Sequence, residues 1–205
     1  MARWIGRENV RKLLKALGEG RTTYAGGAAT FETADETIVV RPPFGFSHKG
    51  AYDAIVVEPL FEALFADRVV AVVLVRLGGF AVGVFEGERL VASKVGSRFV
   101  KGRHKKGGSS SGRFRRRREE QARALIDAAA ETAVRVLEPW REQIEFVALG
   151  GDRRAVEELL QDARLSWLEE KRLPRFFTTE DPRQRTLERL PYDLYAAEVI
   201  EEGAT

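Results

Sequence analysis

The chain has 205 residues, with 34 Lys and Arg against 31 Asp and Glu and no Cys. Hydrophobic residues make up 44% and charged residues 32%, which is enough for a buried core under a strongly solvated surface and excludes global disorder. The lack of Cys excludes disulfides, thiolate metal sites, a Cys nucleophile and CxxC redox chemistry. His48 and His104 are the only imidazoles, and we expect neither a metal nor a bound cofactor.

The N-terminal sequence does not resemble a secretory signal, because it lacks a continuous apolar region and a small-residue cleavage site. The longest apolar run, Val69–Val75, has seven residues and ends at Arg76. A membrane-spanning helix needs about 20 apolar residues. We therefore expect a cytoplasmic protein.

The first fifty residues predict one helix and two strands. Apolar residues at helical spacing indicate a short amphipathic helix over residues 9–17. Residues 20–27 are interpreted as a turn-rich connector, and β-branched residues then predict strands over 30–33 and 37–41. Residues 42–50, which include His48, show no regular period and indicate a linker or a docked arm; His48 itself is interpreted as a surface or packing residue.

A helix and a three-stranded meander follow. Pro59 fits the first turn of a helix with an apolar stripe. Strands are then predicted over 68–77, 80–86 and 89–95, with glycines at the two turns between them. The first of these strands is apolar on both faces, which predicts a central strand covered on both sides.

The C-terminal part alternates helices and strands. A long helix is predicted from Arg113 to near Pro139, and then a strand over 144–149. An amphipathic helix follows the next glycine pair, and a strand is predicted over 173–178. Residues 194–200 fit a strand, although a helix fits them nearly as well.

This pattern predicts the α/β class, with a mixed β-sheet and helices on both of its faces. Strands joined by hairpins come first and strands joined through helices follow, so we expect both antiparallel and parallel pairs in the sheet. We expect residues 1–50 to form a helix and strand extension packed on the core, and residues 51–205 to form the main domain.

The most unusual segment is Lys101–Arg118, with the sequence KGRHKKGGSSSGRFRRRR. It holds nine Lys and Arg and no acidic residue, so the rest of the chain has 25 basic against 31 acidic residues. Such a concentration of charge is typical of a nucleic-acid contact, although a solvated loop leading into a surface helix has the same composition. Continuation of the run onto a helix, and the abrupt start of acidic residues at Glu119, favour the contact.

Other chemistry fits this segment poorly. No glycine stands at the spacing of a phosphate-binding Walker loop. The three serines have only His104 as a nearby imidazole and no carboxylate to orient it, which argues against a Ser-His triad. Downstream, Gly150-Gly151-Asp152 could cradle a phosphate before a helix, but a strand-to-helix turn capped by Asp152 fits better.

Four segments together resemble a known family. FAVGVFEGERLVASKV, then KKGGSSSGRF with RRRREEQ, then a long helix, then FVALGGDRRAVEELL are similar to the catalytic middle domain of archaeal and eukaryotic class-1 peptide release factors. The chain most resembles the actinobacterial and chloroflexal branch of Vms-like release factors. The resemblance covers roughly residues 68–200 and rests mainly on the loop and the helix after it.

The resemblance implies a ribonuclease H-like mixed sheet and a peptidyl-tRNA hydrolase that acts on stalled ribosomes. It implies the large ribosomal subunit, ribosomal RNA and peptidyl-tRNA as partners of a monomer that binds no membrane. Its glycine loop would enter the peptidyl transferase centre, with catalytic positions at Gly107, Gly108, Ser109, Ser110 and Ser111. The residues that would contact RNA are Lys101, Arg103, His104, Lys105, Lys106, Arg113, Arg115, Arg116, Arg117 and Arg118.

One position departs from the family pattern. Ser109 stands where the family has a glutamine, and none of the next three residues is Gln. A serine still offers a backbone N–H and a hydroxyl that holds water. The alternative is a ribosome-binding rescue or hibernation factor that has kept the fold and lost the reaction.

Overall fold

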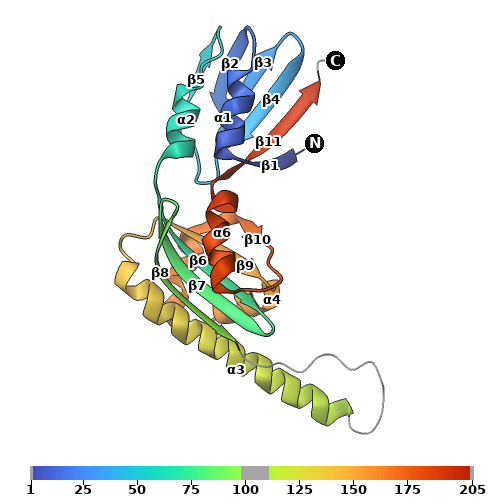
Figure 1. The fold of residues 1–205 in the computed structure, drawn as a ribbon, viewed down its shortest axis with the longest axis vertical. Coiled ribbons are helices and arrows are strands. Elements are labelled where there is room, and N and C mark those ends of the chain that lie inside the picture. Colours follow the sequence, from blue (N-terminus) through green and yellow to red (C-terminus); the bar gives the residue numbers. More distant parts are fainter. Residues whose placement is uncertain (1, 98–110, 204–205) are drawn as a thin grey trace. The chain divides into compact units, whose positions relative to one another are not determined.

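A computed structural model describes residues 2–97 and 111–203 (Figure 1). The chain forms two compact units. The first unit combines Met1–Asp67 with Leu190–Thr205, and the second consists of Arg68–Arg189. The division expected at residue 50 falls at the start of a strand inside the first unit.

The first unit is a six-stranded antiparallel sheet with two helices, in the strand order β1-β11-β4-β3-β2-β5. Its elements are β1 (Ala2–Gly6), α1 (Arg7–Lys15), β2 (Gly20–Ala25), β3 (Ala28–Thr33), β4 (Glu36–Arg41), β5 (Gly50–Tyr52), α2 (Glu58–Phe65) and β11 (Ala196–Gly203). The predicted helix, the two predicted strands and the helix at Pro59 are confirmed.

One core joins the two helices to the sheet. Val10 and Leu14 of α1 and Leu60 and Leu64 of α2 are buried against Phe31 and its neighbours in the sheet. Burial of such side chains stabilises the fold by about 1.5 to 3 kcal/mol each. The apolar stripes that the sequence predicted on these helices are therefore the faces that pack on the sheet.

The second unit is a five-stranded mixed sheet in the order β10-β9-β6-β7-β8. The β6, β7 and β8 strands form an antiparallel meander, whereas β9 and β10 run parallel to β6. Its elements are β6 (Val69–Arg76), β7 (Gly79–Glu86), β8 (Arg89–Ser97), α3 (Ser111–Leu137), β9 (Phe146–Gly151), α4 (Arg153–Leu159), α5 (Trp167–Glu170), β10 (Arg172–Phe177) and the first part of α6 (Gln184–Leu194), which continues into the first unit at Leu190. Short 3-10 turns lie at Glu138–Trp140 and Ala163–Leu165.

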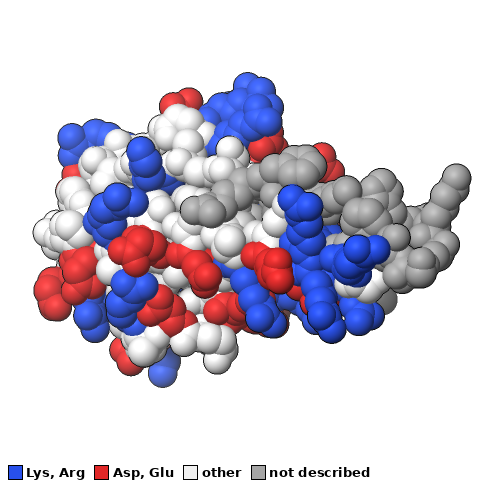
Figure 2. Space-filling model, turned by 90° about the horizontal axis from the view of Figure 1, so that it is seen from below, with Lys and Arg blue, Asp and Glu red and all other residues white. Residues whose placement is uncertain are grey.

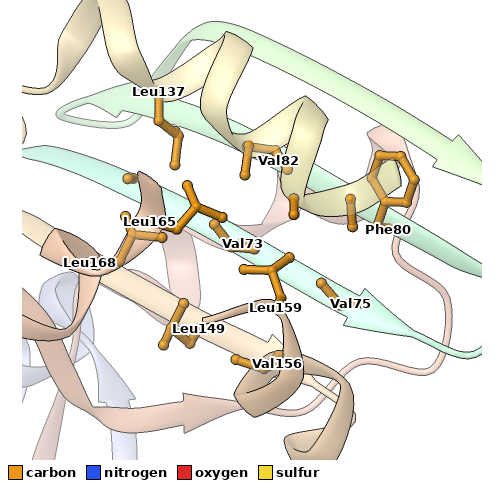
Figure 3. Packing of buried hydrophobic residues seen from close by; sticks show 14 of the residues in the cluster. Val73, Val75, Phe80, Val82, Leu137, Leu149, Val156, Leu159, Leu165 and Leu168 are labelled. Atoms are coloured by element: carbon orange, nitrogen blue, oxygen red, sulfur yellow. The ribbon is translucent and has the colours of Figure 1, made fainter. Parts of the chain in front are cut away.

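Helices cover both faces of this sheet, as predicted. On one face, Val73 of β6, Leu137 of α3 and Leu159 of α4 point into one cluster (Figure 3). On the other face, Gly83 of β7 lies beneath Leu187 of α6, with 3.4 Å between the leucine Cδ1 and the position that a Cβ of Gly83 would occupy. The central strand β6 is buried from Val70 to Val75, so its apolar run is confirmed as a core strand.

One segment was predicted wrongly, and four short or irregular elements, β1, β5, α5 and α6, were not predicted. Residues 20–27 contain the strand β2 rather than a connector, since Thr22 and Tyr24 point into the core on alternate positions. Strand β1 and helix α6 were not predicted, because β1 is short and α6 contains Pro191 within its apolar pattern. No helix in the described ranges is long and apolar enough to cross a membrane.

Candidate functional site

The last part of the basic run, Arg113–Arg118, lies on the first turns of α3. This helix has 27 residues, which corresponds to a length of about 40 Å at 1.5 Å per residue. Arg, Glu, Gln and Ala, which are strong helix formers, fill most of its first half. Pro139 lies two residues beyond its last residue, Leu137, and prevents the helix from continuing.

The second half of α3 is fixed to the sheet. Leu125, Ala129, Ala133 and Leu137 are completely buried at spacings of four residues and pack in the cluster with β6 and β7. Alanine at two of these positions lets the helix backbone approach the strands closely. This half therefore acts as the anchor of the helix.

The first turns of α3, residues 111–121, are called the stem here. Arg113, Arg115, Arg116 and Arg117 are exposed, and Arg118 is partly buried. The side chains of Ser111 and Phe114 are not described. Figure 2 shows Lys and Arg side chains gathered at the right of its view, on the side where α3 begins. The stem thus presents a concentrated positive surface, as an RNA-binding helix requires.

Acidic residues do little to neutralise the stem. An ion pair joins Arg115 Nε to Glu119 Oε1 at 3.9 Å between two exposed side chains. Exposed pairs of this kind contribute about 0.3 to 0.5 kcal/mol. The arginines therefore remain available to an external polyanion.

Formal charge is divided unevenly between the two units. The second unit holds 26 Lys and Arg against 18 Asp and Glu, a difference of +8, whereas the first holds 8 against 13, a difference of −5. Nine of the 26 basic residues belong to Lys101–Arg118. An RNA partner is therefore expected on the second unit, and on this segment in particular.

Most of the predicted loop positions lie outside the described residues. These are Lys101, Arg103, His104, Lys105, Lys106, Gly107, Gly108, Ser109 and Ser110. Ser111 is the first residue of α3. Their catalytic and RNA-binding roles remain predictions, whereas the five arginines of the stem are located on one helix.

One further basic residue of α3 was not predicted to contact RNA. Arg123 is exposed and lies five residues beyond Arg118, so it extends the basic surface past the two glutamates at 119 and 120. The sequence feature that could have identified Arg123 is its helical spacing from Arg116. The two residues are seven apart, which places them on the same side of a helix.

The turn after β9 is structural. Asp152 caps α4, because its Oδ1 accepts a hydrogen bond from Ala155 N at 3.1 Å, and this confirms the preferred interpretation of the sequence. A Cβ on Gly150 would lie 2.2 Å from Phe177 O, and one on Gly151 would lie 2.1 Å from Val75 O. These glycines allow neighbouring strands to approach.

His48 is a packing residue, as predicted. Its Nε2 lies 3.1 Å from Tyr52 Oη, and its ring meets that of Tyr24 edge to face at 4.8 Å. The rings of Phe46 and Tyr52 complete the group. This contact holds the irregular segment before β5 against the sheet of the first unit.

The family comparison agrees with this description of the second unit. The model of the Actinobacteria/chloroflexi VLRF1 release factor family matches residues 68–200, which begin at the second unit and include α3. Peptide chain release factor subunit 1 of Archaeoglobus fulgidus is 27% identical over 104 residues, covering 51% of this chain and 26% of that protein. The match thus spans about half of this chain and about a quarter of the archaeal relative.

Two solved structures show a low similarity to this chain. The crystal structure of the archaeal translation termination factor aRF1 has a TM-score of 0.45 and 14% sequence identity, and the match covers 95% of this chain and 66% of that one. The structure of a second archaeal protein has a TM-score of 0.34 at the same identity and coverage. Because the family model matches well over half of the sequence, the resemblance inferred from the loop and helix is confirmed, and the chain belongs to the Actinobacteria/chloroflexi VLRF1 release factor family.

Proposed function

We propose that the protein releases nascent peptides from stalled ribosomes by hydrolysing the ester bond of peptidyl-tRNA. The observation that carries the proposal is the position of Gly107-Gly108, three residues before a helix whose first turns carry five arginines. Membership of a release-factor family supports it. The family's role in translation termination or ribosome rescue gives the reaction class.

The reaction needs water and hydrogen-bond donors. Water attacks the carbonyl carbon of the ester, the bond to the 3′ oxygen of the tRNA breaks, and that oxygen takes a proton from the water. In the proposed mechanism the backbone N–H of Ser109 stabilises charge on the reacting oxygens, and its hydroxyl holds the water. The glycines let this backbone approach the substrate closely.

The stem supplies the affinity in this proposal. Its arginines neutralise phosphates of ribosomal RNA in the large subunit and release bound counterions. When the whole of α3 is helical on the ribosome, its buried half, which includes Leu125 and Ala129, holds the other end at a fixed distance from the sheet. The loop would then be presented to the peptidyl transferase centre on a stiff support.

The experiment measures release of labelled peptide from stalled ribosome complexes. We expect release by the native chain and its loss in Gly107→Ala with Gly108→Ala, while ribosome binding is retained. Gly18→Ala is the control that should leave release unchanged. A Cβ at this position would have no neighbour within 4 Å, and Gly18 does not have a positive φ. Intact binding without release above a blank would refute the hydrolase.

A second function is favoured by one observation, the serine at position 109. Loss of one preorganised donor typically lowers the rate by about a hundredfold to a thousandfold, which would leave a ribosome-binding rescue or hibernation factor without useful catalysis. Ser109→Gln separates the two functions. If this substitution creates release where the native chain has none, the protein is the non-catalytic factor.

A further inference from the structure

The two halves of α3 differ in what holds them helical. From Leu125 onward the helix is buried against the sheet. In the stem, none of the side chains that the structure describes is buried. The stem continues a helix that is already formed, but most helical stability in proteins comes from the packing of an apolar face, which the stem lacks. The stem therefore depends on its own side chains, or on a partner, for its stability as a helix.

The charges of its side chains oppose the helix, although the intrinsic helix propensity of Arg, Glu and Gln favours it. The first turn holds no acidic residue, and five arginines stand within eight residues of the end where the helix dipole is positive. Arg113 and Arg117 are four residues apart and Arg115 and Arg118 are three apart, so like charges are neighbours on the helix surface. In the pair with Glu119 the arginine is on the N-terminal side, which is the less favourable order.

Two of these arginines continue the face that packs on the sheet. Arg118 precedes Ala122 by four residues and Leu125 by seven, and Arg115 is three residues before Arg118. Where the sheet no longer covers this face, guanidinium groups replace apolar side chains. Among the described residues, Arg118 Nε is buried and has no hydrogen-bond partner. The exposed guanidinium of Arg115 and the exposed part of Arg118 are the donors on this face, and a phosphate backbone would supply the acceptors.

We propose that RNA completes the stem as a helix. In the free protein the stem opens and closes, and a phosphate backbone lying along Arg115 and Arg118 holds it closed. This inference rests on the proposed RNA partner, but it does not require peptide release. Arg115 and Arg118 are positioning residues, because they set the direction of the stem when RNA is bound.

The test is amide hydrogen exchange of the full chain, alone and with a saturating short RNA duplex at low salt. In the free protein we expect residues 111–121 to exchange at least about tenfold faster than 125–137. RNA should slow the stem by about tenfold or more and leave β2 to β4 of the first unit unchanged. Equal protection of both halves in the free protein, or RNA binding that leaves the stem unchanged, overturns the inference.

Two matched double variants locate the face. Arg115→Gln with Arg118→Gln should raise the protection of the free stem, because repulsion is relieved, and should remove most of the response to RNA. Arg113→Gln with Arg117→Gln, on the opposite side of the helix, should raise free protection similarly but keep the response at saturating RNA. Equal loss of the response in both variants overturns the assignment of the face.

Peptide release by the same samples separates this inference from the proposed function. Protection of the stem by RNA without release supports the inference and contradicts the hydrolase. Release with a stem that is equally protected with and without RNA supports the hydrolase and overturns the inference.

Discussion

At the scale of single residues, Tyr24 links burial to pH dependence. Its side chain is 2% exposed, its hydroxyl donates to Val56 O at 2.6 Å, and burial raises the pKa of Tyr24 to about 12. A raised pKa means that the folded state disfavours the phenolate. The contribution to stability is therefore complete below about pH 10, the pKa of an unfolded tyrosine, and is lost as the pH rises towards the folded value.

We predict that the native chain loses about 1 kcal/mol more unfolding free energy than Tyr24→Phe between about pH 9 and pH 11. The variant lacks the phenol, so its remaining decline measures the other titrating groups. Urea midpoints from far-UV circular dichroism at each pH give the comparison. Parallel declines of the two proteins would show that Tyr24 ionises as freely in the folded as in the unfolded state.

At the scale of elements, the junction of β9 and α4 depends on the absence of a side chain at Gly151. This residue has φ of 100°, and a Cβ would lie 2.1 Å from Val75 O of β6. We predict that Gly151→Ala destabilises the protein by about 3 kcal/mol or more, because strain and displacement of a central strand add together. Gly26→Ala is the control, since Gly26 has φ of 57° but open space around it, and should cost about 1 kcal/mol. Thermal unfolding of both variants measures the two losses of stability. Equal losses in Gly151→Ala and Gly26→Ala would contradict the steric argument.

Elements whose pattern is local were predictable from the sequence. The meander, α3 and the cap of α4 follow from apolar spacing, turn glycines and Asp152. Strand β2 was missed because the glycines around it indicate turns, although Thr22, Thr23 and Tyr24 themselves favour a strand. Helix α6 was missed because Pro191 hides the spacing of Leu187, Leu190 and Leu194, and there tertiary packing outweighs local preference.

At the scale of the whole molecule, the pairing of the two chain ends could not be predicted. Strand β11 lies between β1 and β4, with Val199 opposite both Arg3 and Val40. No local pattern encodes a partner so distant in sequence, and the alternating residues of β11 fit a helix nearly as well. The candidate site was likewise predictable only in part. Composition located the arginines of the stem, but only the packing of Leu125 and its neighbours showed which face of the helix Arg115 and Arg118 occupy.

The uneven charge of the two units gives the last prediction. Because the second unit carries +8 and the first −5, we expect affinity for ribosomes to fall with salt through the second unit alone. Arg115→Gln with Arg118→Gln should reduce the slope of log K against log salt by about 1 to 2, since each lost phosphate contact removes about 0.7 to 0.9. Lys12→Gln with Lys15→Gln, which removes the same charge from exposed positions of α1, should leave the slope unchanged. A slope that falls equally in both variants would mean that net charge, rather than the stem, governs binding.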